Sequence, residues 1–188
     1  MALTKDFVEA HVLRWQEALS KPWYPYRSKW PSRLFHHAPI ENAVKILTDG
    51  NLRSREDPEN MKDKDVAAPG VIVARTHAHN SARLYFRPRT PTQYHIEGIR
   101  KSGECSYGND AHAPVLVMMV FDSRSVLSIP TIKFCDRNSS WVLRRLMTLQ
   151  SIFRIFRSTK FSTLAAPAAT AALSIIVVQK CWLFRQCL

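Results

Sequence analysis

The sequence lacks the short motifs that mark several common enzyme classes. Its 188 residues contain only five glycines, and none belongs to a Walker or Rossmann phosphate-binding loop. A P-loop NTPase and a Rossmann dehydrogenase are therefore excluded. Neither a Gly-x-Ser-x-Gly elbow nor a His-Glu-x-x-His motif occurs, which also excludes an α/β-hydrolase and a zincin protease.

Cysteine patterns and export signals are missing as well. The four cysteines show no spacing typical of a metal site or a disulfide framework. Residues 1–16 contain acids and no apolar core, so we expect no secretory signal peptide. Reduced thiols in a cytoplasmic protein are the expected state.

Acidic residues are absent from the C-terminal part of the chain. All 15 of them lie at or before Asp136, so residues 1–136, with 19 basic residues, carry +4 and residues 137–188, with 8, carry +8. The total of +12 favours a polyanionic partner. Asp, Glu, Gly, His and Tyr are all missing after residue 140. This change of composition predicts that the tail, residues 141–188, is read out of frame.

Short helices and short strands alternate along the rest of the sequence. A chain of this length is expected to form one domain, and the alternation predicts the α+β class. Residues 20–32 and 53–66 read as loops, the first rich in proline and aromatics and the second highly charged. The apolar spacing predicts helices at 4–19 and 40–52, the second capped by Gly50, and strands at 33–39, 69–77, 114–122 and 126–136.

Several polar residues stand out, each with an ordinary explanation beside a functional one. The pair His36-His37 is more often a packing or surface pair than a site. His77 and His79 would share one face of a strand, but no Cys/His pair completes a tetrahedral site, so we expect no metal. Arginines such as those at 87 and 89 are most often solvated cations.

Three segments taken together are more specific than these single residues. They read LFHHAPIENAVKILTDGNLRSR (34–55), ARLYFRPRTPTQYHIEGIR (82–100) and AHAPVLVMMVFD (111–122). In this order and spacing they resemble the DarT family of DNA ADP-ribosyltransferases, over about residues 33–140. The motif Thr-Pro-Thr-Gln-Tyr, followed by Glu-Gly, looks more like the guanine-modifying branch of the family than the thymine-modifying branch.

The resemblance implies a compact ADP-ribosyltransferase-like α+β domain with a central mixed or antiparallel sheet, incomplete at its C-terminal end. An N-terminal helix and loop, residues 1–32, would precede this domain, residues 33–140. The implied reaction transfers ADP-ribose from NAD+ to a base in single-stranded DNA. Such enzymes usually act as toxins, opposed by a macrodomain antitoxin.

The resemblance also assigns roles to residues. It places NAD binding at His36, His37, Ala38 and Arg53, and its catalytic arginine at Arg55 or Arg75. The physical chemistry fits, because arginines bind diphosphates in a bidentate way and an unstacked base needs aromatic platforms. We expect contacts to DNA or to NAD phosphate from Tyr85, Arg87, Arg89 and Tyr94.

The family's catalytic glutamate has no counterpart in this sequence. That residue lies downstream, on a strand worded roughly Ala-Glu-Val-Leu-Val-Pro, and Glu97 belongs to the upstream motif instead. Residues 178–185 can be written in codons that give Ala-Glu-Val-Leu-Val-Val-Pro when read one nucleotide earlier. We therefore expect an impaired enzyme, because the developing positive charge on the ribose lacks its carboxylate.

Three alternatives remain open at this point. The chain could be a catalytically dead remnant that binds NAD and DNA, or a small basic nucleic-acid-binding protein without an NAD role. The apolar residues 164–178 could also anchor the chain in a membrane. That segment has 15 residues and an internal proline, which falls short of the roughly 20 that span a bilayer, so we expect no membrane partner.

Overall fold

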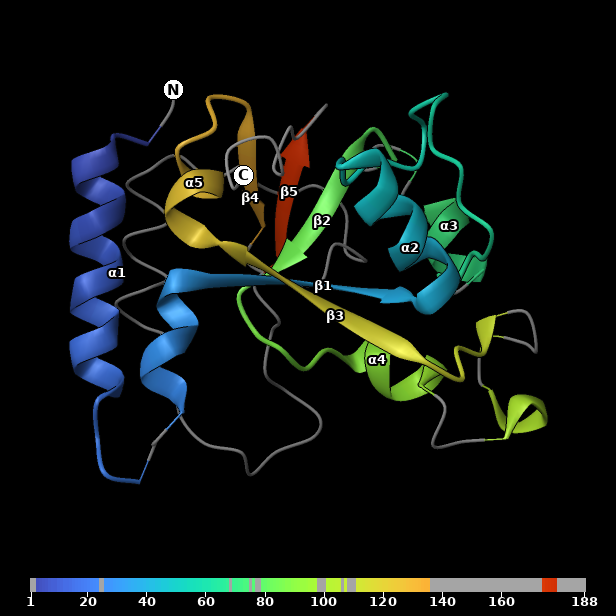
Figure 1. Cartoon of the computed structure of the whole chain (residues 1–188), viewed down its shortest axis with the longest axis horizontal. Helices are drawn as coiled ribbons and strands as arrows, with labels where there is room; N and C mark the ends of the chain where they lie inside the picture. The colour runs from blue at the N-terminus through green and yellow to red at the C-terminus, as the bar shows by residue number, and fades with distance from the viewer. Residues whose placement is uncertain are drawn as a thin grey trace.

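A five-stranded antiparallel sheet organises the protein (Figure 1). In the computed structural model the described residues are 3–23, 26–67, 69–74, 76, 79–97, 101–105, 107, 111–135 and 174–178. The strands follow the order β3-β1-β2-β5-β4, and every neighbouring pair is antiparallel. Their bounds are β1 Arg33–Pro39, β2 Ser81–Tyr85, β3 Leu116–Asp122, β4 Ile132–Cys135 and β5 Ser174–Val178. The α+β class expected from the sequence is confirmed.

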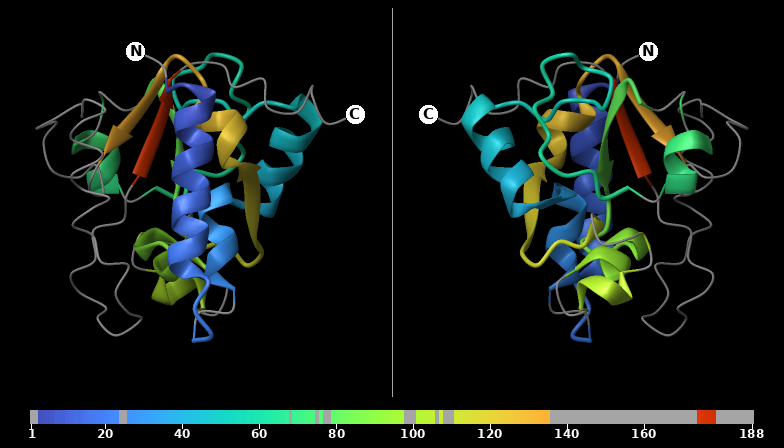
Figure 2. Two further views of the ribbon diagram at one scale, coloured as in Figure 1. Left: turned by 90° about the vertical axis from the view of Figure 1, so that its left-hand side faces the viewer. Right: turned by 90° about the vertical axis from the view of Figure 1, so that its right-hand side faces the viewer.

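Helices lie around both ends of this sheet. They are α1 Lys5–Leu19, α2 Ile40–Asp49, α3 Pro69–Ala74, α4 Pro91–Ile96 and α5 Ser123–Leu127, with short 3₁₀ turns η1 Arg27–Ser32 and η3 Ser102–Glu104. Figure 1 shows α1 at one end of the molecule and α2 and α3 at the other, and the left view of Figure 2 looks onto α1. The middle of the sheet is therefore left between two groups of helices.

The first helix forms as its sequence pattern predicts. Thr4 caps it by accepting a hydrogen bond from the backbone N–H of Phe7 at 3.3 Å, which satisfies one free donor of the first turn. Its buried residues are Val8, Val12 and Leu19, three of the residues that the spacing places on one face. This face packs the helix onto η1 and α5.

The second helix ends where predicted, but the face that it buries differs from the one that a simple amphipathic pattern predicts. Gly50 stops it in the left-handed conformation with φ of 71°, which favours glycine. The face shared by Ile40, Val44 and Leu47 is 42%, 57% and 59% exposed. The helix instead turns Ala43, only 2% exposed, toward the core, since a small side chain allows a close approach to the sheet.

Three strand predictions need correction. In the predicted strand 126–136, residues 126 and 127 end the helix α5, and β4 covers only Ile132–Cys135. Residues 69–74 form the helix α3 instead of a strand; proline at the first position of a helix is favourable, and periodicity cannot separate short apolar runs. The apolar run ending at Asp122 is a strand, but it is not buried on both faces. Met118 and Val120 are 46% and 48% exposed while Met119 and Phe121 are 7% and 6%, because only the face that carries Met119 and Phe121 packs on the core.

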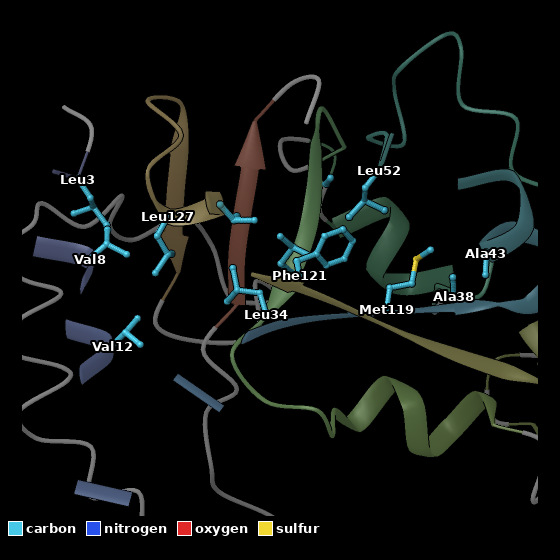
Figure 3. Close-up of a cluster of buried hydrophobic side chains, with 13 residues drawn as sticks. Leu3, Val8, Val12, Leu34, Ala38, Ala43, Leu52, Met119, Phe121 and Leu127 are labelled. Carbon is cyan, nitrogen blue, oxygen red and sulfur yellow. The ribbon is translucent and has the colours of Figure 1, made fainter. Parts of the chain in front are cut away.

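The main core lies over one face of the sheet and extends from α1 to α2 (Figure 3). Leu34 of β1, Leu84 of β2 and Val126 of α5 are each 0% exposed. A smaller cluster around Ile96 and Cys105 packs near α4. These contacts fix β1 and β2, the two strands that carry the candidate site, against the helices.

One strand comes from the segment after residue 140. β5, with the sequence Ser-Ile-Ile-Val-Val, pairs with β2 on one side and β4 on the other. The end of the apolar segment 164–178 is therefore part of the sheet. Among the helices that the structure describes, none combines the length and apolar character needed for a membrane crossing.

Candidate active site

A cavity of about 300 Å³ lies where β1, β2, α2 and the loop after α2 meet. Its size is at the lower end of the range for small-molecule sites. The six predicted site residues that line it are His36, His37, Ala38, Arg53, Arg55 and Tyr85. Arg87, Arg89 and Tyr94 are not among its lining residues, and Arg75 lies outside the described residues.

His36 is held in one orientation by the neighbouring strand. Its Nδ1 lies 2.9 Å from the backbone carbonyl of Arg83, so Nδ1–H donates and Nε2 remains an acceptor. Burial lowers the pKa of His36 to about 4, although the Arg83 carbonyl opposes this shift. The imidazole is therefore neutral at physiological pH and can accept a hydrogen bond from a ligand hydroxyl.

His37 also lines the cavity but is less well satisfied. Neither ring nitrogen makes a well-formed hydrogen bond to a described residue, although both are buried. Burial lowers the pKa of His37, while the Pro88 carbonyl and the charge of Glu97 oppose this. The Pro88 carbonyl thus leaves the ring incompletely satisfied; because such buried groups are uncommon in native proteins, this is consistent with a binding role for the side chain.

The loop after α2 is rich in ion pairs, and these engage Arg53. Its guanidinium donates to both carboxylate oxygens of Asp49, at 2.6 and 2.9 Å. It also contacts Asp57 at 3.4 Å and forms an ion pair with Glu59. Three carboxylates thus surround the arginine to which the family resemblance assigns NAD binding, and they compete with any bound phosphate.

Arg55 is engaged in a similar way. It makes a two-pronged pair with Asp65, one contact of which measures 2.7 Å. Burial would raise the pKa of Asp65, but the hydrogen bonds from Arg55 and Lys62 lower it to about 2. The Asp65 carboxylate is therefore ionised at all physiological pH values and keeps Arg55 at the cavity wall.

Asn42 fixes the same loop to α2, a role that the sequence analysis misses. Its side-chain oxygen accepts from the backbone N–H groups of Asp63 and Lys64 at 2.8 and 3.1 Å, and its amide donates to the Lys64 carbonyl at 2.6 Å. Lys45, one turn further along the helix, pairs with Asp63. The sequence feature that could have indicated this role is the polar Asn42 in the first turn of a helix that follows the His-His strand.

Arg83 is the third arginine of the cavity and differs from the other two. It lies on β2 and lines the cavity. Burial lowers the pKa of its guanidinium, yet no ion pair or hydrogen bond of that group occurs within the described part of the chain. Partial burial of a cation that forms no ion pair is expensive, although the charge of Asp65 partly offsets this cost, so this position favours an anionic ligand.

Carboxylates reach the cavity, but all of those described there are already paired. Asp49 and Glu59 bind Arg53, and Asp65 binds Arg55. Glu97 lies nearby, accepting from Gln93 at 3.4 Å, without being one of the lining residues. The strand β5 next to β2 contains no acidic residue.

The residues predicted to contact DNA extend from the cavity to the surface. Tyr85 lines the cavity, Arg87 is half-buried, Arg89 is exposed, and Tyr94 is 54% exposed. Burial, together with the charge of Arg27, lowers the pKa of Arg87. Among the described residues no group of three or more His, Cys, Asp or Glu is arranged to hold a metal ion, and His77 lies outside them.

Comparison with solved structures finds the same fold in a bacterial protein. The chain is similar to Thermus sp. 2.9 DarT in complex with ADP-ribosylated ssDNA, with a TM-score of 0.61 and 20% identity over 80% of this chain and 76% of that one. The complexes of the same protein with NAD+ and with carba-NAD+ match over the same shares, with TM-scores of 0.55 and 0.56. At this identity the likeness establishes the fold alone. None of the curated proteins matches the chain.

A family model gives the stronger result. The model described as "ssDNA thymidine ADP-ribosyltransferase, DarT" matches residues 35–153. This match begins on β1 at the cavity and continues beyond residue 140, where the composition changes. Because it covers more than half of the 188 residues, the chain belongs to the DarT family.

Proposed function

We propose that this protein binds NAD+ and transfers its ADP-ribose to a base in single-stranded DNA, with transfer impaired in this chain. The observation that carries the proposal is the cavity in which neutral His36 and Arg83 lie on adjacent strands. The Thermus sp. 2.9 protein of the same fold is known in complexes with NAD+ and with ADP-ribosylated ssDNA. Family membership and cavity chemistry therefore support the same substrate.

The binding step assigns a role to each strand. His36 presents Nε2 as an acceptor, which suits a ribose hydroxyl of NAD+. Arg83 provides the cation for the diphosphate, because Arg53 and Arg55 are neutralised by Asp49, Glu59 and Asp65. The loop after α2, held by Asn42, covers the ligand.

The transfer step breaks the bond between nicotinamide and C1′ of the ribose. Nicotinamide leaves with the bonding electrons, C1′ develops positive charge, and a base atom forms the new bond to C1′ and loses its proton. A carboxylate beside C1′ stabilises this charge in comparable glycosyl transfers. The described carboxylates of the cavity are paired with arginines, and we propose that the step is slow for this reason.

The register of the sheet offers a direct test of that reason. Position 176 of β5 pairs with Arg83, which lines the cavity, and position 175 pairs with Leu84, which is 0% exposed in the core. Directly opposed residues share a face of the sheet. The variant Ile176→Glu introduces a carboxylate at the position paired with Arg83, and Ile175→Glu introduces one at the position paired with Leu84 as its matched control.

The assay follows release of nicotinamide from NAD+ and incorporation of labelled ADP-ribose into single-stranded oligonucleotides. We expect slow release by the parent chain, faster release by Ile176→Glu and none by His36→Ala. Measurable NAD+ binding with no transfer in the parent and in Ile176→Glu would support the alternative, a non-catalytic remnant that binds NAD and DNA. Absence of NAD+ binding in the parent chain would refute both the impaired transferase and the non-catalytic remnant.

We propose guanine as the modified base, on the wording Thr-Pro-Thr-Gln-Tyr and Glu-Gly in residues 90–98. The family description names thymidine, so the two bases are direct competitors. Oligonucleotides that differ only in containing guanine or thymine separate them. Label on the thymine strand alone would refute the guanine assignment.

The resemblance further implies a toxin of the cytoplasm whose mark a macrodomain antitoxin removes, and we retain this as a proposal. Its test is treatment of the labelled oligonucleotide with a DNA-deribosylating macrodomain. Loss of label is expected, and a stable label would refute the assignment.

A further inference from the structure

The segment before β1 has an unusual surface composition. Residues 21–33 contain four basic residues and no acid. Two of its aromatic side chains point into solvent, with Trp23 69% and Tyr26 78% exposed. Exposed rings interleaved with cations are the composition by which proteins bind single strands without sequence preference, because every base offers a face for stacking.

This segment is anchored on the core. Ser123, which is 0% exposed, donates a hydrogen bond from Oγ to the carbonyl of Pro31 at 2.8 Å. The guanidinium carbon of Arg27 lies 5.6 Å from the centroid of the Trp30 ring, within the range of a cation–π contact. The turn that contains Arg27 and Trp30 is therefore fixed, and little of its conformational entropy is lost when a ligand binds beside it.

The same segment leads into β1, the strand that carries the cavity-lining residues His36 and His37. η1 leads directly into β1, and Phe35 of β1 pairs with Tyr85, which lines the cavity. Arg27 begins η1, which leads into β1, and Arg87 follows Tyr85 of β2, the strand paired with β1. The charge of Arg27 also contributes to the lowered pKa of Arg87. Two like charges that the fold brings together form a favourable place for a phosphate.

We propose that Trp23, Tyr26, Arg27 and Arg87 form a single-stranded DNA-binding surface that holds the strand outside the cavity. Bases stack on the two exposed rings, and the phosphodiester backbone follows the two arginines toward Tyr85. This surface, which we call the aromatic-basic surface, rests on the proposed function for the identity of the strand. It adds a second contact region to the base-modifying site.

The test measures binding of a fluorescein-labelled 16-nucleotide single strand of mixed sequence to the full chain by fluorescence anisotropy. Stacking contributes about 1–3 kcal/mol per base, so the double variant Trp23→Ala/Tyr26→Ala should weaken binding by at least about tenfold. Leu13→Ala is the matched control, since Leu13 is an apolar residue of α1 that is 54% exposed; it should bind as the parent does. In the variant Arg27→Gln, the slope of log K against the logarithm of the salt concentration should become shallower by about 0.7.

NAD+ binding, measured by calorimetry on the same proteins, separates this proposal from the proposed function. Loss of DNA affinity in the double variant with unchanged NAD+ affinity supports the aromatic-basic surface. Binding within twofold of the parent in both the double variant and Arg27→Gln would overturn it, even if nicotinamide release continued. Equal loss with Leu13→Ala, or preference for a duplex of the same sequence, would overturn it too.

Discussion

Arg83 provides the sharpest test of how the cavity recognises NAD+. It is the lining arginine whose guanidinium makes no ion pair within the described residues, whereas Arg53 contacts three carboxylates. We expect Arg83→Met to remove the diphosphate contact while leaving the local fold intact. The backbone carbonyl of residue 83, which orients His36 at 2.9 Å, is retained in this variant.

The magnitude follows from the chemistry of the contact. A hydrogen bond to a charged group contributes about 1.5–3 kcal/mol, which corresponds to a loss of roughly tenfold to 150-fold in affinity. Isothermal titration calorimetry with NAD+ measures this directly. Nicotinamide riboside, which has no diphosphate, is the matched ligand, and its affinity should change by less than about twofold in the same variant.

Arg53→Met is the control variant, and it should behave differently. It leaves Asp49, Asp57 and Glu59 facing one another without their shared cation, so its main effect should be a lower free energy of unfolding in the apo protein. If Arg53→Met lost the diphosphate contact and Arg83→Met bound NAD+ normally, the assignment of the two arginines would be refuted.

Three further predictions concern stability and its pH dependence. His36 has a pKa of 6.5 in the unfolded chain and of about 4 in the folded protein. Its contribution to the free energy of unfolding is therefore complete above pH 6.5 and falls by up to roughly 3 kcal/mol toward pH 4. The variant His36→Gln should abolish this pH dependence. Urea unfolding at pH 7.5 and 4.5 measures this, and an equal pH dependence in parent and variant would contradict it. Gly50→Ala should cost about 1 kcal/mol, since the residue has φ of 71°; an unchanged urea midpoint would argue against strain at this cap. Leu34→Ala should cost about 2–5 kcal/mol because Leu34 is 0% exposed, and a smaller loss would mean that the core collapses around the deletion.

The sequence was most informative where local chemistry determines the local structure. The period of apolar residues gave α1, and Gly50 gave the end of α2 through its left-handed conformation. The sequence was least informative where contacts with distant parts of the chain determine the position of an element. The strand of residues 116–122 is at an edge of the described sheet because β1 is its one neighbour there, and no local pattern shows this.

The same distinction applies to the site. His36 and His37 were found because they form part of a recognisable motif, and both line the cavity. Arg83 belongs to the same segment as Arg87 and Arg89 but was not singled out, since only the pairing of β1 with β2 places it at the cavity. The engagement of Arg53 by carboxylates depends on how a charged loop folds, which periodicity cannot predict.

The position of β2 makes binding and turnover separable in this protein. On one side, its backbone holds His36 through the Arg83 carbonyl, and the Arg83 side chain lines the cavity. On the other side, it pairs with β5, whose position 176 lies opposite Arg83. We therefore expect affinity for NAD+ to depend on β1, β2 and the loop after α2. We expect the rate of bond cleavage to respond instead to a carboxylate introduced at position 176, so this substitution should alter turnover without altering the affinity for NAD+.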